Sequence, residues 1–182
     1  MFKSILVLES SWDKDTVDSQ SVWPFIREFA NVIGLHAHHQ TFSDKNSFEH
    51  WINLYNHEKL PKDKLLYIAA HGSKNQINGL SSSINRESVF TILKRSKNLK
   101  FIHFGSCNFG NDENLGLVLK NAKHIKWAAG YSKSVDWIDS TLIDILFWHR
   151  QNSHDTNNKG LKTQNRTRIL YEDIPLAEKN WL

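Results

Sequence analysis

The chain has 182 residues, a length typical of one domain with a single core. It carries 23 basic and 19 acidic residues, and the net charge of +4 is too mild to indicate a nucleic-acid partner. The single cysteine excludes an internal disulfide, and no apolar run approaches the roughly 20 residues that span a membrane. We therefore expect one domain over residues 1–182, without a signal peptide or membrane partner, in the reducing cytoplasm.

Short apolar runs alternate along the chain with runs whose apolar residues recur at helical spacing. The short runs predict strands buried on both faces of a sheet. These expected strands cover residues 4–8, 35–42, 65–70, 101–104 and 125–131. Apolar residues three and four positions apart predict helices. The expected helices cover residues 22–33, 47–55, 85–93, 114–122 and 139–149.

Glycine and polar residues mark the ends of several of these elements. Gly34 is expected to end the first helix, and Ser47 and Asn85 are expected to cap the second and third. Residues 73–83 are rich in turn formers, and Asn78-Gly79 predicts a hairpin turn within them.

The order of elements predicts the fold class. Strand–helix alternation indicates an α/β domain, with a mostly parallel central sheet and helices on both faces. We expect about six strands, because residues 168–171 could form a last strand after a polar, loop-rich segment at 151–167. The predicted architecture is thus a single three-layer sandwich.

Two reactive side chains directly follow expected strands, where open α/β sheets bind their ligands. His71 follows residues 65–70, and Cys107 follows residues 101–104 and two small residues. One strand–helix–strand crossover separates them, so the two strand ends should be neighbours at one edge of the sheet. A thiolate is a nucleophile, and a nearby imidazole accepts the thiol proton and later protonates a leaving amine. The pair therefore predicts catalysis by Cys107 with His71 as the acid–base group.

Small residues beside both side chains leave room for a substrate. Gly72 lacks a Cβ, so its N–H can approach a substrate oxygen closely. We expect the backbone N–H groups of Gly72 and Cys107 to form an oxyanion hole. Gly105 and Ser106 leave space for a substrate backbone.

Two segments carry a resemblance to a known family. LLYIAAHGS at 65–73 and LKFIHFGSC at 99–107 resemble the paired motifs of the caspase-like (clan CD) cysteine peptidases. In that family an apolar strand ends in His-Gly, and a later one ends in a small residue and Cys. The Gly-Ser-Cys form is similar to the CHAT and separase branch rather than to animal caspases. WAAGYSKSVDWIDSTLIDILFW at 127–148 also resembles the CHAT segment after the catalytic strand.

This resemblance implies a caspase-like fold and a cysteine endopeptidase that acylates its cysteine, without a metal or cofactor. It implies a protein or peptide substrate, and it leaves open whether an activator or regulatory partner is needed. CHAT-type enzymes commonly prefer a basic residue before the cleaved bond, and a basic side chain needs an acidic pocket floor.

Several side chains are candidates for the substrate pocket. The acidic candidates for its floor are Asp136, Asp139, Asp13 and Glu9. Asp136 and Asp139 follow the expected strand at 125–131, although Asp139 is equally a candidate N-cap for the helix at 139–149. Trp12 and Trp137 both follow expected strands and could line the cleft.

Two other classes of protein stay open. A catalytically inactive, caspase-like interaction module would keep both motif residues, but its thiol would titrate at or above the free value of about 8.5. A flavodoxin-like ligand-binding domain would make the His–Cys pair a coincidence, with the two side chains pointing away from a shared cleft.

The remaining histidines give weaker signals. His36, His38 and His39 lie in the expected strand at 35–42, where His36 and His38 share one face with Gln40, and no cysteine or carboxylate accompanies them. We interpret them as polar residues of an edge strand rather than metal ligands. His103 lies inside an apolar run, and we expect it to be a hydrogen-bonded core histidine.

Overall fold

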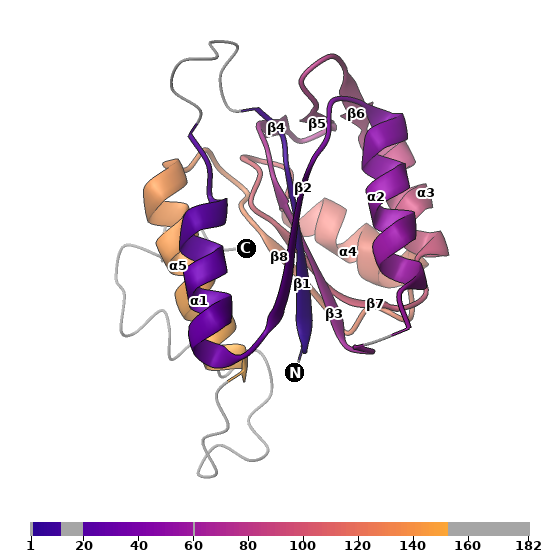
Figure 1. Cartoon of the computed structure of the whole chain (residues 1–182). Coiled ribbons are helices and arrows are strands. Elements are labelled where there is room, and N and C mark those ends of the chain that lie inside the picture. Colours follow the sequence, from indigo (N-terminus) through magenta and orange to yellow (C-terminus); the bar gives the residue numbers. More distant parts are fainter. Residues whose placement is uncertain (1, 12–19, 60, 153–182) are drawn as a thin grey trace.

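A computed structural model describes residues 2–11, 20–59 and 61–152. In this part of the chain, five parallel strands form a central sheet in the order β2-β1-β3-β7-β8 (Figure 1). This is the 2-1-3-4-5 order of doubly wound sheets, whose ligands bind at the carboxyl ends of the strands. The strands are β1 (Ser4–Glu9), β2 (His36–Thr41), β3 (Lys64–Ala69), β7 (Leu99–Phe104) and β8 (Trp127–Gly130).

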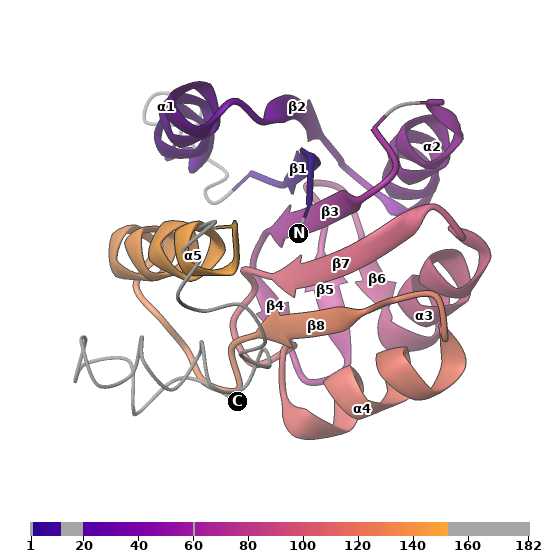
Figure 2. The same ribbon diagram turned by 90° about the horizontal axis from the view of Figure 1, so that it is seen from below.

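Helices cover both faces of this sheet (Figures 1 and 2). One face carries α1 (Trp23–Ile33) and α5 (Trp137–Asn152). The other carries α2 (Lys45–His57), α3 (Arg86–Arg95) and α4 (Asp112–Asn121). The predicted three-layer α/β architecture with a mostly parallel sheet is confirmed. No helix in the described ranges combines the length and apolar character needed to cross a bilayer.

Alternate residues of each strand face opposite helix layers. Leu66 and Ile68 of β3 pack into the core under α2, α3 and α4, whereas Leu65 and Tyr67 pack on the side of α1 and α5. All six residues of β1 and all six of β3 are buried, which explains their continuous apolar runs. β2 is an edge strand, and its polar residues are partly exposed, as its histidines predicted.

A second, small antiparallel sheet lies at the carboxyl edge of the large one (Figure 1). It consists of β4 (Gly72–Ser73), β5 (Gln76–Asn78) and β6 (Ser83–Asn85), in a region predicted only as turn-rich. Asn78-Gly79 does begin a hairpin connection, because the Gly79 N–H donates to the Ser82 carbonyl at 3.1 Å. The expected strand at 168–171 lies outside the described residues.

Two predicted helix ends are confirmed, and the C-terminal end of α5 is not where the sequence placed it. Gly34 ends α1 in the left-handed conformation, with φ of 69°. Asn85 caps α3, and its side chain accepts the Ser88 N–H at 2.9 Å. Gln151 and Asn152 were expected to begin a loop but are the last residues of α5, because Gln151 is still buried against the core side.

Three helices begin earlier than predicted, among them α5, which starts at Trp137 rather than at 139. Asp44, not Ser47, is the N-cap of α2, and it accepts the Ser47 N–H at 2.8 Å in a capping box. Asn111 is the N-cap of α4 and accepts the Asn114 N–H at 3.0 Å, so this helix starts before Asn114.

Candidate active site at the carboxyl ends of β3 and β7

His71 and Cys107 follow neighbouring strands at matched positions. β3 and β7 pair in parallel, with Ile68 opposite Phe104. His71 is the third residue after Ile68, and Cys107 is the third residue after Phe104. The two strand ends are therefore neighbours at one edge of the sheet, as the single crossover between them predicts. The catalytic roles of the two residues stay predictions.

Gly72 packs directly against the backbone of the cysteine loop. A Cβ on Gly72 would lie 3.1 Å from the Cys107 carbonyl oxygen and 3.1 Å from the Ser106 Cβ. Ordinary van der Waals contacts are longer than this, so a residue without a Cβ lets the two segments keep this spacing. The segment after β3 and the segment after β7 thus touch beside the two reactive side chains.

The hairpin of β4 and β5 sets the direction of the Gly72 N–H. Gly72 lies opposite Ile77, and the Asn78 N–H donates to the His71 carbonyl at 2.8 Å. Bonded and non-bonded pairs alternate along an antiparallel ladder, so Gly72 and Ile77 form a non-bonded pair. The Gly72 N–H therefore points away from β5 and is not used by the hairpin.

The Cys107 thiol is half-buried beside the loop that follows β8. The Val135 N–H donates to its Sγ at 3.5 Å, and the S–H donates to the Val135 carbonyl at 3.8 Å. The next residue, Asn108, donates its N–H to the Lys133 carbonyl at 3.3 Å. Asn108 has φ of 62°, a left-handed conformation that asparagine tolerates, and it turns the chain after the cysteine. The loop at 131–136 therefore holds two successive residues of the cysteine loop.

The His71 side chain is exposed, in contrast to the residues that lead to it. Ala69 and Ala70 are fully buried at the end of β3. The core of the sheet therefore ends directly before the imidazole, and the chain enters β4 directly after it.

A buried polar cluster lies on the α1–α5 side of the sheet. Tyr67 and Tyr131 donate their hydroxyl groups to the two carboxylate oxygens of Asp144, each at 2.6 Å. His103 Nε2 lies 3.0 Å from the same carboxylate, and Trp148 Nε1 donates to His103 Nδ1 at 2.9 Å. Because Nδ1 accepts, the proton of the neutral imidazole is on Nε2, which faces Asp144. The prediction that His103 is a hydrogen-bonded core histidine is confirmed.

This cluster reaches the candidate site through Tyr67. A Cβ on Gly105 would collide with the Tyr67 hydroxyl and ring, so the small residue before Ser106 is needed for packing. Burial, and then the Asp144 charge, raises the pKa of Tyr67 and of Tyr131 well above its usual value. Asp144 was not among the residues predicted from the sequence, although an acidic residue on the apolar face of an amphipathic helix was a usable signal.

The acidic candidates after β8 differ in what they contact. Asp136 Oδ1 accepts the N–H groups of Ile138 at 2.8 Å and Asp139 at 3.2 Å, so Asp136 caps α5. Asp139 lies in the first turn of α5 with an exposed side chain. The alternative that Asp139 is the N-cap is therefore wrong, because α5 begins at Trp137.

Glu9 ends β1 with a buried carboxylate that serves the fold. Its Oε1 accepts the Val22 N–H at 2.9 Å, and its Oε2 accepts the Ser21 hydroxyl at 2.7 Å. His39 Nε2 lies 2.9 Å from the same Oε2. Both oxygens thus hold the start of α1 against β1 and β2, which leaves Glu9 a poor candidate for a pocket floor.

Of the remaining pocket candidates Trp12, Asp13 and Trp137, the structure describes only Trp137. Trp12 and Asp13 lie outside the described residues. Trp137 is half-buried at the start of α5, and its ring centroid lies 6.2 Å from that of Phe25. Its ring packs against the core on the α1–α5 side.

The histidines of β2 do not converge. His38 Nε2 lies 3.7 Å from the Glu58 carboxylate, whereas His39 pairs with Glu9. Over residues 2–11, 20–59 and 61–152, no three His, Cys, Asp or Glu side chains are grouped so that they could hold a metal ion.

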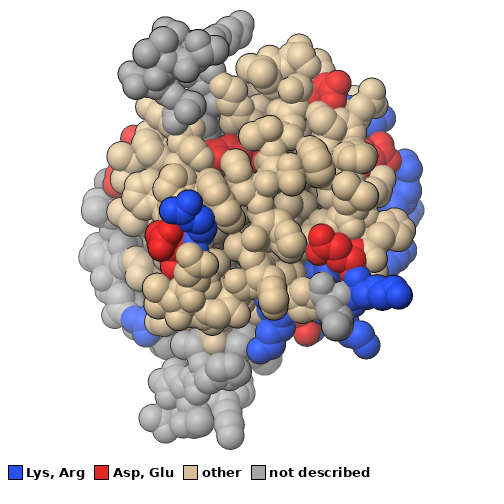
Figure 3. Space-filling model, in the orientation of Figure 1, with Lys and Arg blue, Asp and Glu red and all other residues tan. Residues whose placement is uncertain are grey.

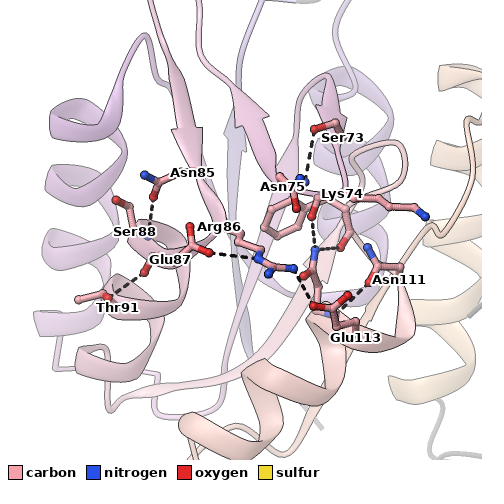
Figure 4. Close-up of polar contacts among 12 residues, drawn as sticks. Ser73, Lys74, Asn75, Asn85, Arg86, Glu87, Ser88, Thr91, Asn111 and Glu113 are labelled. Atoms are coloured by element: carbon pink, nitrogen blue, oxygen red, sulfur yellow. Dashed lines mark hydrogen bonds and ion pairs between the residues drawn. The ribbon is translucent and has the colours of Figure 1, made fainter.

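Polar contacts connect the hairpin that follows His71 to α3 and α4 (Figure 4). The Arg86 backbone N–H donates to the Asn75 carbonyl at 2.9 Å, which attaches the β4–β5 turn to the start of α3. The Arg86 guanidinium donates to Glu87 at 3.1 Å and to Glu113 of α4 at 2.8 Å. Figure 4 shows these three side chains meeting between the two helices. The hairpin is therefore attached to the start of α3, and α3 is joined to α4 by the Arg86–Glu113 ion pair.

Basic side chains gather at the other end of the sheet. Figure 3 shows lysine and arginine at the lower right, where α2 ends and β3 begins in Figure 1. Lys126 pairs with Asp63 at 2.9 Å and lowers the pKa of that carboxyl. Burial, together with the charges of Lys97 and Lys100, lowers the pKa of His124. Lys97, Lys100 and Lys126 thus place positive charge at the amino ends of β7 and β8, at the edge of the sheet opposite the candidate site.

No protein-family model matches this sequence, and no curated protein matches it. The site is defined by its own geometry, in which two strand ends bring a His-Gly and a Gly-Ser-Cys segment into backbone contact.

Proposed function

We propose that this protein is a cysteine endopeptidase of the caspase/CHAT type, with Cys107 as nucleophile and His71 as acid–base group. The observation that carries the proposal is the contact between the two strand-end loops, where Gly72 packs against the Cys107 carbonyl. The parallel, three-layer α/β fold supports a caspase-like architecture, because it presents both loops at the edge where such sheets bind ligands.

The chemistry uses the two side chains in turn. The His71 imidazole removes the Cys107 thiol proton, and the thiolate attacks the carbonyl carbon of the scissile peptide bond. The tetrahedral intermediate collapses, the C–N bond breaks, and the imidazolium gives its proton to the leaving amine. Water, deprotonated by the same imidazole, then hydrolyses the thioester, which releases the new carboxylic acid and restores the thiol.

The proposed oxyanion hole consists of the N–H groups of Gly72 and Cys107. The direction of the Gly72 N–H, away from β5, supports this role because the hairpin does not consume that donor. Fixed backbone donors of this kind stabilise the negative charge that develops on the carbonyl oxygen.

The proposed substrate is a protein or peptide with a basic residue before the cleaved bond. Asp139 supports this preference, because its carboxylate is exposed in the first turn of α5, at the same edge as Cys107. Asp136 adds a second negative charge there, although its Oδ1 caps the helix. Trp137 is the proposed wall of the pocket. A catalytic thiol of this kind fits the reducing cytoplasm.

The contact between Cys107 and Val135 suggests what an activating partner or bound substrate would do. The S–H donates to the Val135 carbonyl at 3.8 Å, so the thiol proton is directed at the loop at 131–136. That contact must be released before His71 can take the proton. We expect the loop to shift on binding.

The same contact favours the alternative of a catalytically inactive interaction module. In that protein the Val135 backbone would hold Cys107 as a structural thiol, and the scaffold would bind a partner without cleaving it. The 2-1-3-4-5 strand order also suits a flavodoxin-like ligand-binding domain, in which the His–Cys pair has no joint role.

Thiol labelling separates these functions. The protein is incubated with a peptidyl ketone inhibitor that carries arginine next to the reactive ketone. The mass of the product is then measured by intact-mass spectrometry. We expect one adduct on wild type, none on Cys107→Ala, and strongly slowed labelling of His71→Ala. His50→Ala is the matched control, because His50 is an exposed histidine of α2. A wild-type protein that stays unlabelled, with an alkylation midpoint at or above about pH 8.5, supports the inactive module.

A further inference from the structure

Asn114 lies between the two loops that follow β3 and β7. Its side chain is fully buried, and its Nδ2 donates to the Lys74 carbonyl at 2.8 Å and to the Phe109 carbonyl at 2.9 Å. Lys74 follows His71 within the hairpin, and Phe109 follows Cys107 within its loop. One side-chain amide therefore joins the segment that bears the histidine to the segment that bears the cysteine.

The two carbonyl groups determine how the Asn114 amide is oriented. Both partners are acceptors, so the NH₂ group must face them, and the reversed amide would place three oxygen atoms together. The Oδ1 is buried and accepts no hydrogen bond within the described part of the chain. A buried acceptor without a donor lowers stability. The amide therefore binds one carbonyl group of each loop and fixes their spacing, while its own oxygen stays without a donor among the described residues.

The first turn of α4 holds Asn114 in place. The Asn111 side chain accepts the Asn114 N–H at 3.0 Å and donates through Nδ2 to the Asn108 carbonyl at 2.8 Å. The same turn is joined to α3 through the Arg86–Glu113 ion pair (Figure 4). The helix is thus fixed to the cysteine loop and to the hairpin at once.

We infer that Asn114 is a positioning residue, which sets the separation between the His71 imidazole and the Cys107 sulfur. It acts through the two carbonyl groups that it holds and contacts no reacting atom. This inference rests on the proposed endopeptidase function. Without the amide, the hairpin and the cysteine loop separate, and the imidazole no longer supports the thiolate.

Asn114→Leu tests this role, because leucine keeps the branched shape and removes both donors. We expect the pH midpoint of Cys107 alkylation by iodoacetamide to rise toward about 8.5. We also expect labelling by the arginyl peptide ketone to slow about tenfold or more. Asn114→Ser, which keeps one donor, should lie between wild type and Asn114→Leu in both measurements.

Asn56→Leu is the matched control. Asn56 is a buried asparagine whose Oδ1 accepts the Asn98 N–H at 2.8 Å, at the amino end of β7 and the opposite edge of the sheet. Its loss should weaken the fold without moving the alkylation midpoint. All variants are compared at a temperature where circular dichroism shows them folded.

The outcomes separate the inference from the proposed function. If Asn114→Leu is folded and keeps the wild-type midpoint, while His71→Ala raises it, Asn114 is not a positioning residue and the proposed function stands. If the wild-type midpoint is already about 8.5 and His71→Ala leaves it there, the proposed function fails and the inference fails with it. If Asn114→Leu does not fold, Asn114→Ser decides by the same comparison.

Discussion

The Cys107 carbonyl oxygen lies 3.1 Å from the point that a Cβ on Gly72 would occupy. Gly72→Ala must therefore move the two loops apart by a few tenths of an ångström, which displaces His71 from Cys107. Alanine restricts the unfolded chain, which offsets about 0.4–1 kcal/mol of the strain. We expect labelling by the arginyl peptide ketone to slow about tenfold, with a melting temperature near that of wild type.

Gly116→Ala is the control for this experiment. No atom outside the helix lies within 4 Å of a Cβ on Gly116, which is in the middle of α4. This variant should label at the wild-type rate and gain stability, because alanine favours a helix interior by about 1 kcal/mol over glycine. Wild-type labelling by Gly72→Ala would show that the contact between the loops does not set the site.

Asp144→Asn is expected to destabilise the fold. The carboxylate accepts hydroxyl groups from Tyr67 and Tyr131, and asparagine offers only one acceptor oxygen. One buried hydroxyl then faces an NH₂ group, which costs about 2–4 kcal/mol of unfolding free energy. Urea unfolding measures the loss. Asp112→Asn, at an exposed position of α4, should change the unfolding free energy by less than about 0.5 kcal/mol. An Asp144→Asn protein as stable as wild type would contradict the prediction.

Alkaline pH should weaken the fold through the same cluster. The pKa of Tyr67 and of Tyr131 is raised in the folded state by burial and by the Asp144 charge, from an ordinary value of 10.0. The stability that these groups contribute is therefore complete below pH 10 and is lost as pH rises from there toward the folded pKa values. Each tyrosine lowers the unfolding free energy by about 1.4 kcal/mol per pH unit in that window. Tyr131→Phe should flatten the pH dependence of urea unfolding above pH 10, and an unchanged slope would show that Tyr131 ionises in the folded protein.

The proposed preference for a basic residue is tested at the two acidic residues after β8. Asp139→Asn should slow labelling by an arginyl peptide ketone about tenfold, and labelling by the leucyl analogue less than about twofold, because only arginine needs the charge. Asp136→Asn keeps the helix cap, since asparagine caps as well as aspartate does. Any change in labelling rate of Asp136→Asn should therefore come from the lost negative charge and not from a weakened helix cap. Equal effects on the arginyl and leucyl probes would exclude both residues from the specificity pocket.

Sequence periodicity predicted the strands and helices well, and the errors at helix starts share one cause. Each of the three N-caps lies three residues before the residue that was predicted to cap or to begin the helix. The pairs are Asp44 and Ser47, Asn111 and Asn114, and Asp136 and Asp139. In each pair the cap side chain accepts the backbone N–H of the later residue, so both positions attract polar residues. A single sequence therefore does not distinguish the cap from the third residue of the helix.

The placement of His71 and Cys107 was predictable because strand ends in a parallel sheet share an edge. Their supporting contacts were not, because periodicity identifies the face of a side chain and not its partner. Tyr67 and Asp144 are 77 positions apart, and Asn114 and Lys74 are 40 apart. Such pairs depend on how the layers pack in three dimensions, as does the contact of Cys107 with Val135.

The small sheet of β4, β5 and β6 gives the two halves of the site different local stabilities. Cys107 follows β7, a central strand whose residues are almost all buried. The amide hydrogens of β7 should therefore exchange with solvent only when the whole domain unfolds. His71 leads into a short hairpin with mostly exposed residues, whose amides should exchange through local opening. On heating, the hairpin should loosen first, so the proposed activation of the Cys107 thiol by His71 would be lost at a temperature at which the five-stranded sheet is still intact.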